Sequence, residues 1–159
     1  TTVLGVAKLT GFDIQTDARF TANLETDFAL KAEMTLKAIE QNDLVFVHIK
    51  ATDLAGHDNL PFEKVEAIEC YDRMVGAILD RLPEHTYFAL AADHSTPCEV
   101  REHTGEPVPV VIYGQDIRRD HVLTYDEIAC AEGSLKRLTG TSFINTIFDY
   151  MGYSHKQGS

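Results

Sequence analysis

The chain has 159 residues, of which 44% are hydrophobic and 25% are charged, as in one ordinary globular domain. Its formal net charge of -11 argues against non-specific nucleic-acid binding, because no basic stripe is present to neutralise phosphates. No apolar run approaches the roughly 20 residues of a membrane span. The three cysteines are widely spaced and favour neither a disulfide framework nor a CxxC zinc site, so a reducing cytoplasm is the simplest compartment.

The predicted elements of the first half alternate between helix and strand. Residues 1–26 are mixed in character, and we interpret them as a connection arriving from elsewhere. Residues 27–41 have apolar side chains on one helical face, and residues 44–49 (LVFVHI) form the continuous β-branched run of a strand buried on both sides. A polar loop, ATDLAGHDN, follows. Pro61 then opens a long helix that Pro83 stops.

Two more strands are predicted in the second half, at residues 86–92 and 108–113. The long helix before them has one apolar stripe, formed by Val65, Ile68, Tyr71, Val75, Ile78 and Leu82. Thr124 and Glu127 have the spacing of a capping box, so a helix is expected to begin there, and apolar residues in 143–151 indicate a last helix. This order predicts an α/β fold with a mostly parallel sheet. Three strands are few for such a sheet, so we expect other strands to come from a segment outside this chain.

Acidic and histidine side chains gather where the predicted strands end. Asp53 and His57 follow the first strand, Asp93 and His94 end the second, and His103 precedes the third. Ligands of open α/β sheets bind beyond the carboxyl ends of the strands, so all five can meet at one edge. Mixed carboxylate and imidazole sets suit zinc or manganese. Asp93 and His94 can face one ion while the other three hold a second, and such a pair of ions serves phosphoryl transfer.

Plainer interpretations of these residues stay open at this point. Asp58 or Asn59 can be a cap of the next helix instead of part of a site. The remaining histidines are interpreted as surface or core groups: His48, His85, His121 and His155. Two interpretations of these residues therefore remain: a metal site, or a set of scattered polar residues in loops.

Three motifs in series, VHIKATDLAGHDN, ADHSTP and HTGEPVPVVIYG, resemble the archaeal-type cofactor-independent phosphoglycerate mutases of the alkaline phosphatase superfamily. The resemblance runs from about Leu24 to Tyr113 in the family's order. It implies that the chain contains part of that family's three-layer, mostly parallel α/β core. Residues 27–159 would be the C-terminal part of this metal-binding core, and residues 1–26 a connection returning from a missing inserted domain.

The resemblance also implies two divalent metal ions, with manganese first and zinc, cobalt or magnesium as alternatives. Asp53, His57 and His103 would share one ion, and Asp93 and His94 would help to bind the other. The family interconverts 3-phosphoglycerate and 2-phosphoglycerate, in glycolysis and gluconeogenesis, through a phosphoserine intermediate. We therefore expect a small phosphorylated substrate as partner, and neither nucleic acid nor a membrane.

The chain differs from the family in having no match to the N-terminal motif with the nucleophilic serine. Ser95, in DHSTP, stands where the family has a structural residue, so no residue here is predicted to be the nucleophile. We expect the isolated chain to have no mutase activity, and its substrate-binding residues stay unassigned. Two alternatives remain: another metalloenzyme of the superfamily, such as a phosphopentomutase, phosphatase or phosphodiesterase, or a non-catalytic fragment that acts as an interaction module.

Overall fold

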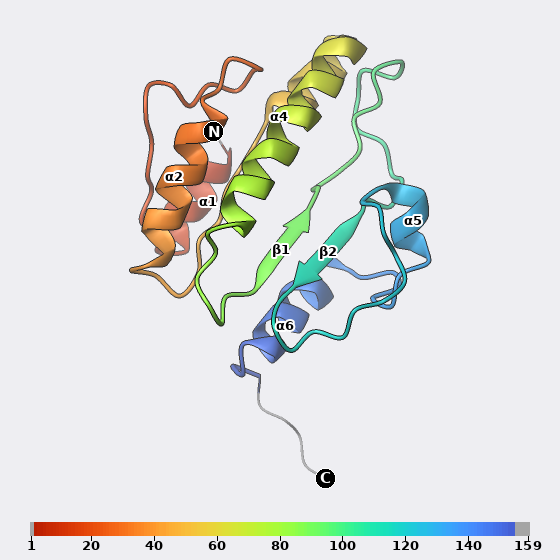
Figure 1. Ribbon diagram of the computed structural model, residues 1–159. Coiled ribbons are helices and arrows are strands. Elements are labelled where there is room, and N and C mark those ends of the chain that lie inside the picture. The colour runs from red at the N-terminus through yellow and green to blue at the C-terminus, as the bar shows by residue number, and fades with distance from the viewer. Residues whose placement is uncertain (1, 155–159) are drawn as a thin grey trace. The chain divides into compact units, whose positions relative to one another are not determined.

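The computed structural model describes residues 2–154, drawn in Figure 1. His155, interpreted above as a surface histidine, lies outside the described residues. The chain forms two compact units, the first made of Thr1–Ala55 and Leu60–Asp80 and the second of Gly56–Asn59 and Arg81–Ser159. No helix among the described residues is both long enough and apolar enough to cross a membrane.

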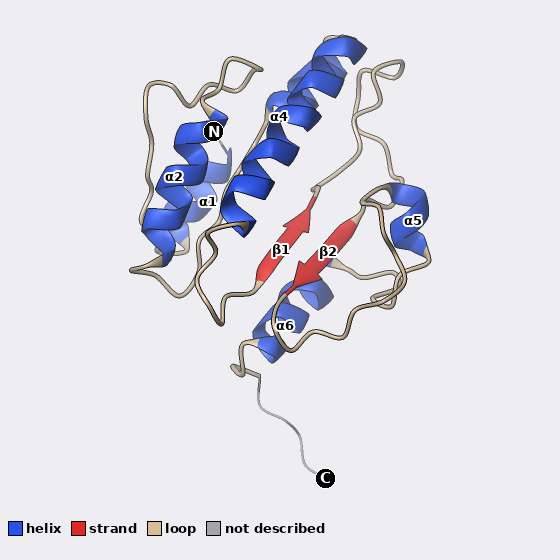
Figure 2. Cartoon of the chain, viewed as in Figure 1, coloured by secondary structure: helices blue, strands red, loops and turns tan. Residues whose placement is uncertain are grey.

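Helices dominate the first unit (Figure 2). Helix α1 (Thr2–Leu9) lies in the segment that was predicted as a connection. Helix α2 (Phe28–Ile39) begins after Asp27, whose carboxylate accepts a hydrogen bond from the Leu30 amide, so the helix predicted here is confirmed. Helix α4 (Pro61–Leu79) has a proline in its first turn, as predicted, and packs along α2.

The core of the first unit lies between α2 and α4. Five of its buried side chains come from these two helices: Ala32, Leu36, Ala67, Met74 and Ile78. The stripe predicted for α4 is wrong in part, because Val65 and Ile68 are 55% and 51% exposed. The face that packs on α2 includes Ala67, which is fully buried and small enough to let the two helices approach closely.

Residues 44–49 follow helix α2 and belong to no strand among the described residues. Leu44 and Phe46 are exposed, whereas Val45, Val47 and Ile49 are half-buried. The prediction of a strand buried on both sides is therefore wrong for this chain. The physical reason is that a strand needs a hydrogen-bonded neighbour, and no described segment pairs with these residues.

The second unit contains the only sheet of the described residues. Strands β1 (Phe88–Ala91) and β2 (Val110–Tyr113) pair antiparallel, with Phe88 opposite Tyr113. The places of these two strands are confirmed, but the predicted three-layer, mostly parallel sheet is not shown. Parallel strands need a long crossover, usually helical, and the described residues between β1 and β2 form no helix. They form a loop that reverses direction, with an isolated antiparallel β-bridge between Ser95 and Thr104.

Two short helices complete the second unit. Helix α5 (Glu127–Ala131) begins after Asp126, whose carboxylate accepts from the Ile128 and Ala129 amides. The predicted cap at Thr124 is therefore wrong: its hydroxyl instead donates to Asp126. Helix α6 (Gly140–Tyr150) confirms the predicted last helix, which begins slightly earlier than expected because Thr139 caps it.

Candidate metal centre

The segment after residue 50, predicted as a polar loop, is helix α3 (Ala51–His57). Ala51 and Ala55 are buried one turn apart, which gives this short helix an apolar face. Asp53 lies in its first turn, where the helix dipole favours a carboxylate. The four-residue spacing places Asp53 and His57 on one face of the helix, so the helix brings these two predicted ligands together.

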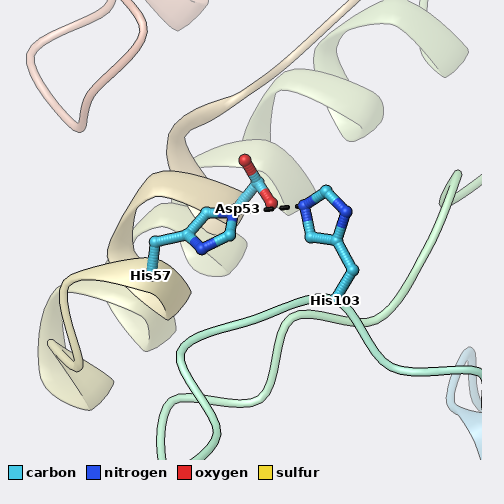
Figure 3. A group of neighbouring side chains, drawn as sticks. All are labelled: Asp53, His57 and His103. Atoms are coloured by element: carbon cyan, nitrogen blue, oxygen red, sulfur yellow. Dashed lines mark hydrogen bonds between the residues drawn. The ribbon is translucent and has the colours of Figure 1, made fainter.

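Three of the five predicted ligands form one cluster. Figure 3 shows the side chains of Asp53, His57 and His103 directed toward one another. Each offers one ligand atom, and these atoms lie within 4.8 Å of one another. The Nε2 atoms of His57 and His103 are 3.1 Å apart, and the two rings are tilted by 47°. Asp53 and His57 are half-buried, and His103 is exposed to entering ions.

The geometry of the two histidines fits a divalent ion. Two nitrogens bound to a tetrahedral zinc at about 2.0–2.1 Å are about 3.3 Å apart. The observed 3.1 Å between the Nε2 atoms is close to that value. One carboxylate and two imidazoles also form a donor set that zinc and manganese accept. The three side chains therefore fit one ion, which would replace the contact between the two Nε2 atoms.

A backbone carbonyl orients the His57 ring. The Nδ1 atom of His57 lies 2.8 Å from the carbonyl oxygen of Arg101. Because a carbonyl can only accept, this contact places the proton on Nδ1 and leaves the Nε2 lone pair for an ion. Hydrogen bonds of this kind around metal ligands fix the tautomer and the ring orientation.

Asn59 holds the loop that contains Arg101 in place through two hydrogen bonds. With its amide oriented to satisfy both partners, Asn59 donates to the Cys98 carbonyl at 3.0 Å and accepts from the Arg101 guanidinium at 3.0 Å. Asn59 and Arg101 both have left-handed backbone conformations, with φ of 53° and 61°. From the sequence, Asn59 is expected only as a possible helix cap. Its contribution to the site could not be recognised from the residue order, because it depends on these two backbone conformations.

Gly56 allows the loop after β1 to approach helix α3. A Cβ atom at Gly56 would stand 2.3 Å from the backbone oxygen of Thr96. Thr96 is 4% exposed, and its hydroxyl lies 3.1 Å from Nδ1 of His94. Gly56 becomes a signal for this contact only once the segment is recognised as a helix, since an isolated glycine within a helix often marks close packing.

Lys50 neutralises part of the charge of the cluster. Its ammonium donates to Oδ2 of Asp53 at 2.6 Å. The Asp53 side chain is only 13% exposed, so this ion pair offsets the cost of placing a carboxylate there. A metal ion at the cluster would compete with Lys50 for that oxygen.

The other two predicted ligands lie beside the cluster but do not join it. The His94 ring stacks on the His103 ring at 3.5 Å between centroids, and its Nε2 is 3.3 Å from Oδ2 of Asp93. The Asp93 side chain is 80% exposed. Within residues 2–154, the trio of Asp53, His57 and His103 is the only group of three or more with metal-site geometry. A second ion at Asp93 and His94 stays a prediction.

Comparison with known protein families agrees with a metal site in this chain. A family model described as the metalloenzyme superfamily matches residues 6–150. The chain belongs to the metalloenzyme superfamily. The superfamily recognised from the three motifs is thereby confirmed, and the match supports the binding of a divalent metal.

Similar proteins include two archaeal enzymes named 2,3-bisphosphoglycerate-independent phosphoglycerate mutase. The chain is 42% identical over 158 residues to that of Thermococcus gammatolerans, and 43% identical over 159 residues to that of Methanopyrus kandleri. Each match covers 99% of this chain but 38% of the relative, so the chain spans less than half of the length of these relatives.

A solved structure of a Pyrococcus horikoshii protein is also similar. It matches with a TM-score of 0.94 and 41% identity, and the match covers 99% of this chain and 48% of that one. This metalloenzyme chain therefore has the same backbone arrangement as about half of a longer protein.

Proposed function

We propose that this metalloenzyme chain is the metal-binding part of a 2,3-bisphosphoglycerate-independent phosphoglycerate mutase, which interconverts 3-phosphoglycerate and 2-phosphoglycerate. The observation that carries the proposal is the cluster of Asp53, His57 and His103 in a chain that matches mutases over 99% of its residues. Residues 27–159 would be the C-terminal part of the core, and residues 1–26 the connection from an inserted domain. The cytoplasm is the proposed location.

The residues of the cluster have distinct roles in this proposal. Asp53, His57 and His103 hold one divalent ion, with manganese first and zinc, cobalt or magnesium as alternatives, and Asp93 and His94 help to hold a second. When bound, such ions activate a nucleophile and neutralise the charge of the phosphoryl oxygens. The Arg101 carbonyl keeps the proton of His57 on Nδ1, so the lone pair of Nε2 is free to bind the ion. The phosphoserine of the proposed intermediate is expected outside this chain.

A chimera tests the proposal. In it, this chain replaces the matching 38% of the Methanopyrus kandleri mutase, and conversion of 3-phosphoglycerate is measured with Mn²⁺ present. We expect turnover that Asp53→Ala and His103→Ala abolish, and that His85→Ala, an exposed histidine outside the cluster, leaves unchanged. A folded, manganese-loaded chimera that hydrolyses phosphate esters and does not form 2-phosphoglycerate would contradict the proposal and favour a phosphatase.

A further inference from the structure

Lys50 is a cation whose partner is one of the candidate metal ligands. It directly precedes helix α3, and its carbonyl accepts from the Leu54 amide at 3.1 Å, which fixes its backbone. Its ammonium lies 2.6 Å from Oδ2 of Asp53, three residues along the chain. The Asp53 side chain is only 13% exposed, whereas that of Lys50 is 46% exposed. The carboxylate is therefore held inside the site, while the lysine side chain borders open water.

An ion at the cluster changes what Lys50 can contact. A divalent ion takes a carboxylate oxygen as ligand at about 2.0–2.2 Å, which leaves that oxygen with less negative charge for an ammonium. Lys50 can then leave Asp53 by rotation of its side chain alone, because four flexible carbons separate the ammonium from the fixed backbone. Its backbone position keeps it near the cluster. The ion and the ammonium repel one another, so an anion that contacts both is favoured.

The charge of the site shows why an anion needs Lys50. One divalent ion at the cluster brings two positive charges, which the carboxylates of Asp53 and Asp93 cancel. Asp93 lies beside the cluster, with its Oδ2 atom 3.3 Å from Nε2 of His94. The chain as a whole has a net charge of -11, so its overall field repels anions. Lys50 therefore provides the net positive charge close to the ion.

We propose that Lys50 is a phosphate-binding residue, which exchanges Asp53 for an oxygen of the substrate's phosphoryl group when an ion occupies the cluster. A phosphate monoester dianion fits this pair of cations, because the ion and the ammonium can each take one of its oxygens. Lys50 thereby makes phosphate binding depend on prior metal binding. The inference rests on the ion proposed at Asp53, His57 and His103, and not on which phosphate ester the complete enzyme converts.

Metal affinity tests the exchange first. Mn²⁺ is titrated calorimetrically into the parent chain, Lys50→Met, Lys50→Arg and the control Lys37→Met, which removes the same charge from an exposed lysine of helix α2 outside the cluster. We expect Lys50→Met to bind Mn²⁺ roughly three- to tenfold more tightly, because the competing ammonium is gone, and the other three proteins to bind alike. Equal affinity in Lys50→Met would overturn the proposal. A parent chain that binds no Mn²⁺ would overturn it together with the metal centre of the proposed function.

Inorganic phosphate tests the second partner of Lys50. Bound Mn²⁺ broadens the ³¹P resonance of a phosphate beside it, so titration into the chain, with protein in excess over Mn²⁺, measures phosphate binding at the ion. We expect saturable broadening in the parent and in Lys37→Met, at least about tenfold weaker phosphate binding in Lys50→Met, and recovery in Lys50→Arg. Unchanged phosphate affinity in Lys50→Met, or no phosphate binding by the loaded parent, would overturn the proposal.

Neither titration measures turnover, so this inference and the proposed function can fail separately. A chain that gives both expected results, within a chimera that forms no 2-phosphoglycerate, would count only against the mutase reaction. An active chimera in which Lys50→Met binds Mn²⁺ and phosphate like the parent would count only against the role of Lys50.

Discussion

Replacing Gly56 with alanine tests how closely the loop after β1 packs on helix α3. The added Cβ would lie 2.3 Å from the Thr96 backbone oxygen, and 3.0 Å and 3.1 Å from two of its side-chain carbons. An ordinary contact begins at 3.4 Å, so the loop must move by about 1 Å. Overpacking of this kind costs about 1–3 kcal/mol, and the gain in helix propensity offsets at most about 1 kcal/mol of it. We expect a net loss of about 1–2 kcal/mol in the free energy of unfolding.

Gly76 is the matched control, because it lies within helix α4 and its added Cβ would meet nothing within 4 Å beyond its chain neighbours and the backbone of its own helix. Gly76→Ala should therefore stabilise the protein by roughly 0.5–1 kcal/mol. The two glycine-to-alanine substitutions are therefore expected to change the free energy of unfolding in opposite directions. Urea unfolding followed by circular dichroism measures both, and the midpoints are compared with that of the parent chain.

The Gly56→Ala change should also weaken metal binding. The displaced loop contains Thr96, whose hydroxyl contacts His94, and the His94 ring stacks on the His103 ring. Mn²⁺ affinity should decrease in Gly56→Ala and stay unchanged in Gly76→Ala. A Gly56→Ala protein that is as stable as the Gly76→Ala protein and binds Mn²⁺ normally would refute the close packing described here.

Three further predictions concern the site and its surroundings. Asn59→Ala should lower Mn²⁺ affinity by roughly tenfold, because it releases the loop that orients His57; calorimetry measures this, and Asn42→Ala, whose amide only contacts the Ala38 carbonyl, should have no effect. Mn²⁺ at a hundred times its Kd should add about 2.7 kcal/mol to the free energy of unfolding, and a chelator should remove it; the same gain in Asp53→Ala would count against the cluster. The Arg19 side chain donates to Asp17 and lowers its pKa from the usual 3.8 to about 2. Because the folded pKa is the lower one, this pair stabilises fully above pH 3.8 and loses its effect as pH falls toward about 2. Asp17→Asn should remove this part of the acid dependence of thermal unfolding, and an unchanged profile would show that the pair does not form.

Local signals predicted several elements correctly. Helix α2 was predicted from the apolar side chains on one of its faces and helix α4 from Pro61 at its start, and both signals lie within the element itself. Strands β1 and β2 lie within the predicted apolar runs, and Pro109 immediately precedes β2, where its missing amide does no harm. Such features need no knowledge of distant residues.

The features that sequence reasoning missed depend on distant or absent partners. Residues 44–49 have the composition of a buried strand, but whether they form one depends on a neighbour that the described chain does not supply. Helix α3 was predicted as a loop because Asp53, Gly56 and His57 are weak helix formers. The antiparallel direction of β2 depends on the course of the whole loop before it, which local propensity does not determine.

The candidate site was partly predictable for a similar reason. Asp53, His57 and His103 could be grouped because each lies next to a predicted strand end. The carbonyl of Arg101 and the amide of Asn59 could not, since backbone groups and left-handed conformations leave no mark in residue type. Asp93 and His94 were grouped by the same reasoning, and the structure places them near the cluster without a third ligand.

Calorimetric titration of Mn²⁺ into the metal-free chain tests the central claim most directly. The titration is repeated with Asp53→Ala, with His103→Ala and with the control His85→Ala, whose side chain is 76% exposed. If Asp53, His57 and His103 form the site, the parent chain and the control bind about one ion saturably, and the first two variants do not. Equal binding by all four proteins, or no binding by the parent chain, would contradict the claim that this chain contains a metal centre of its own.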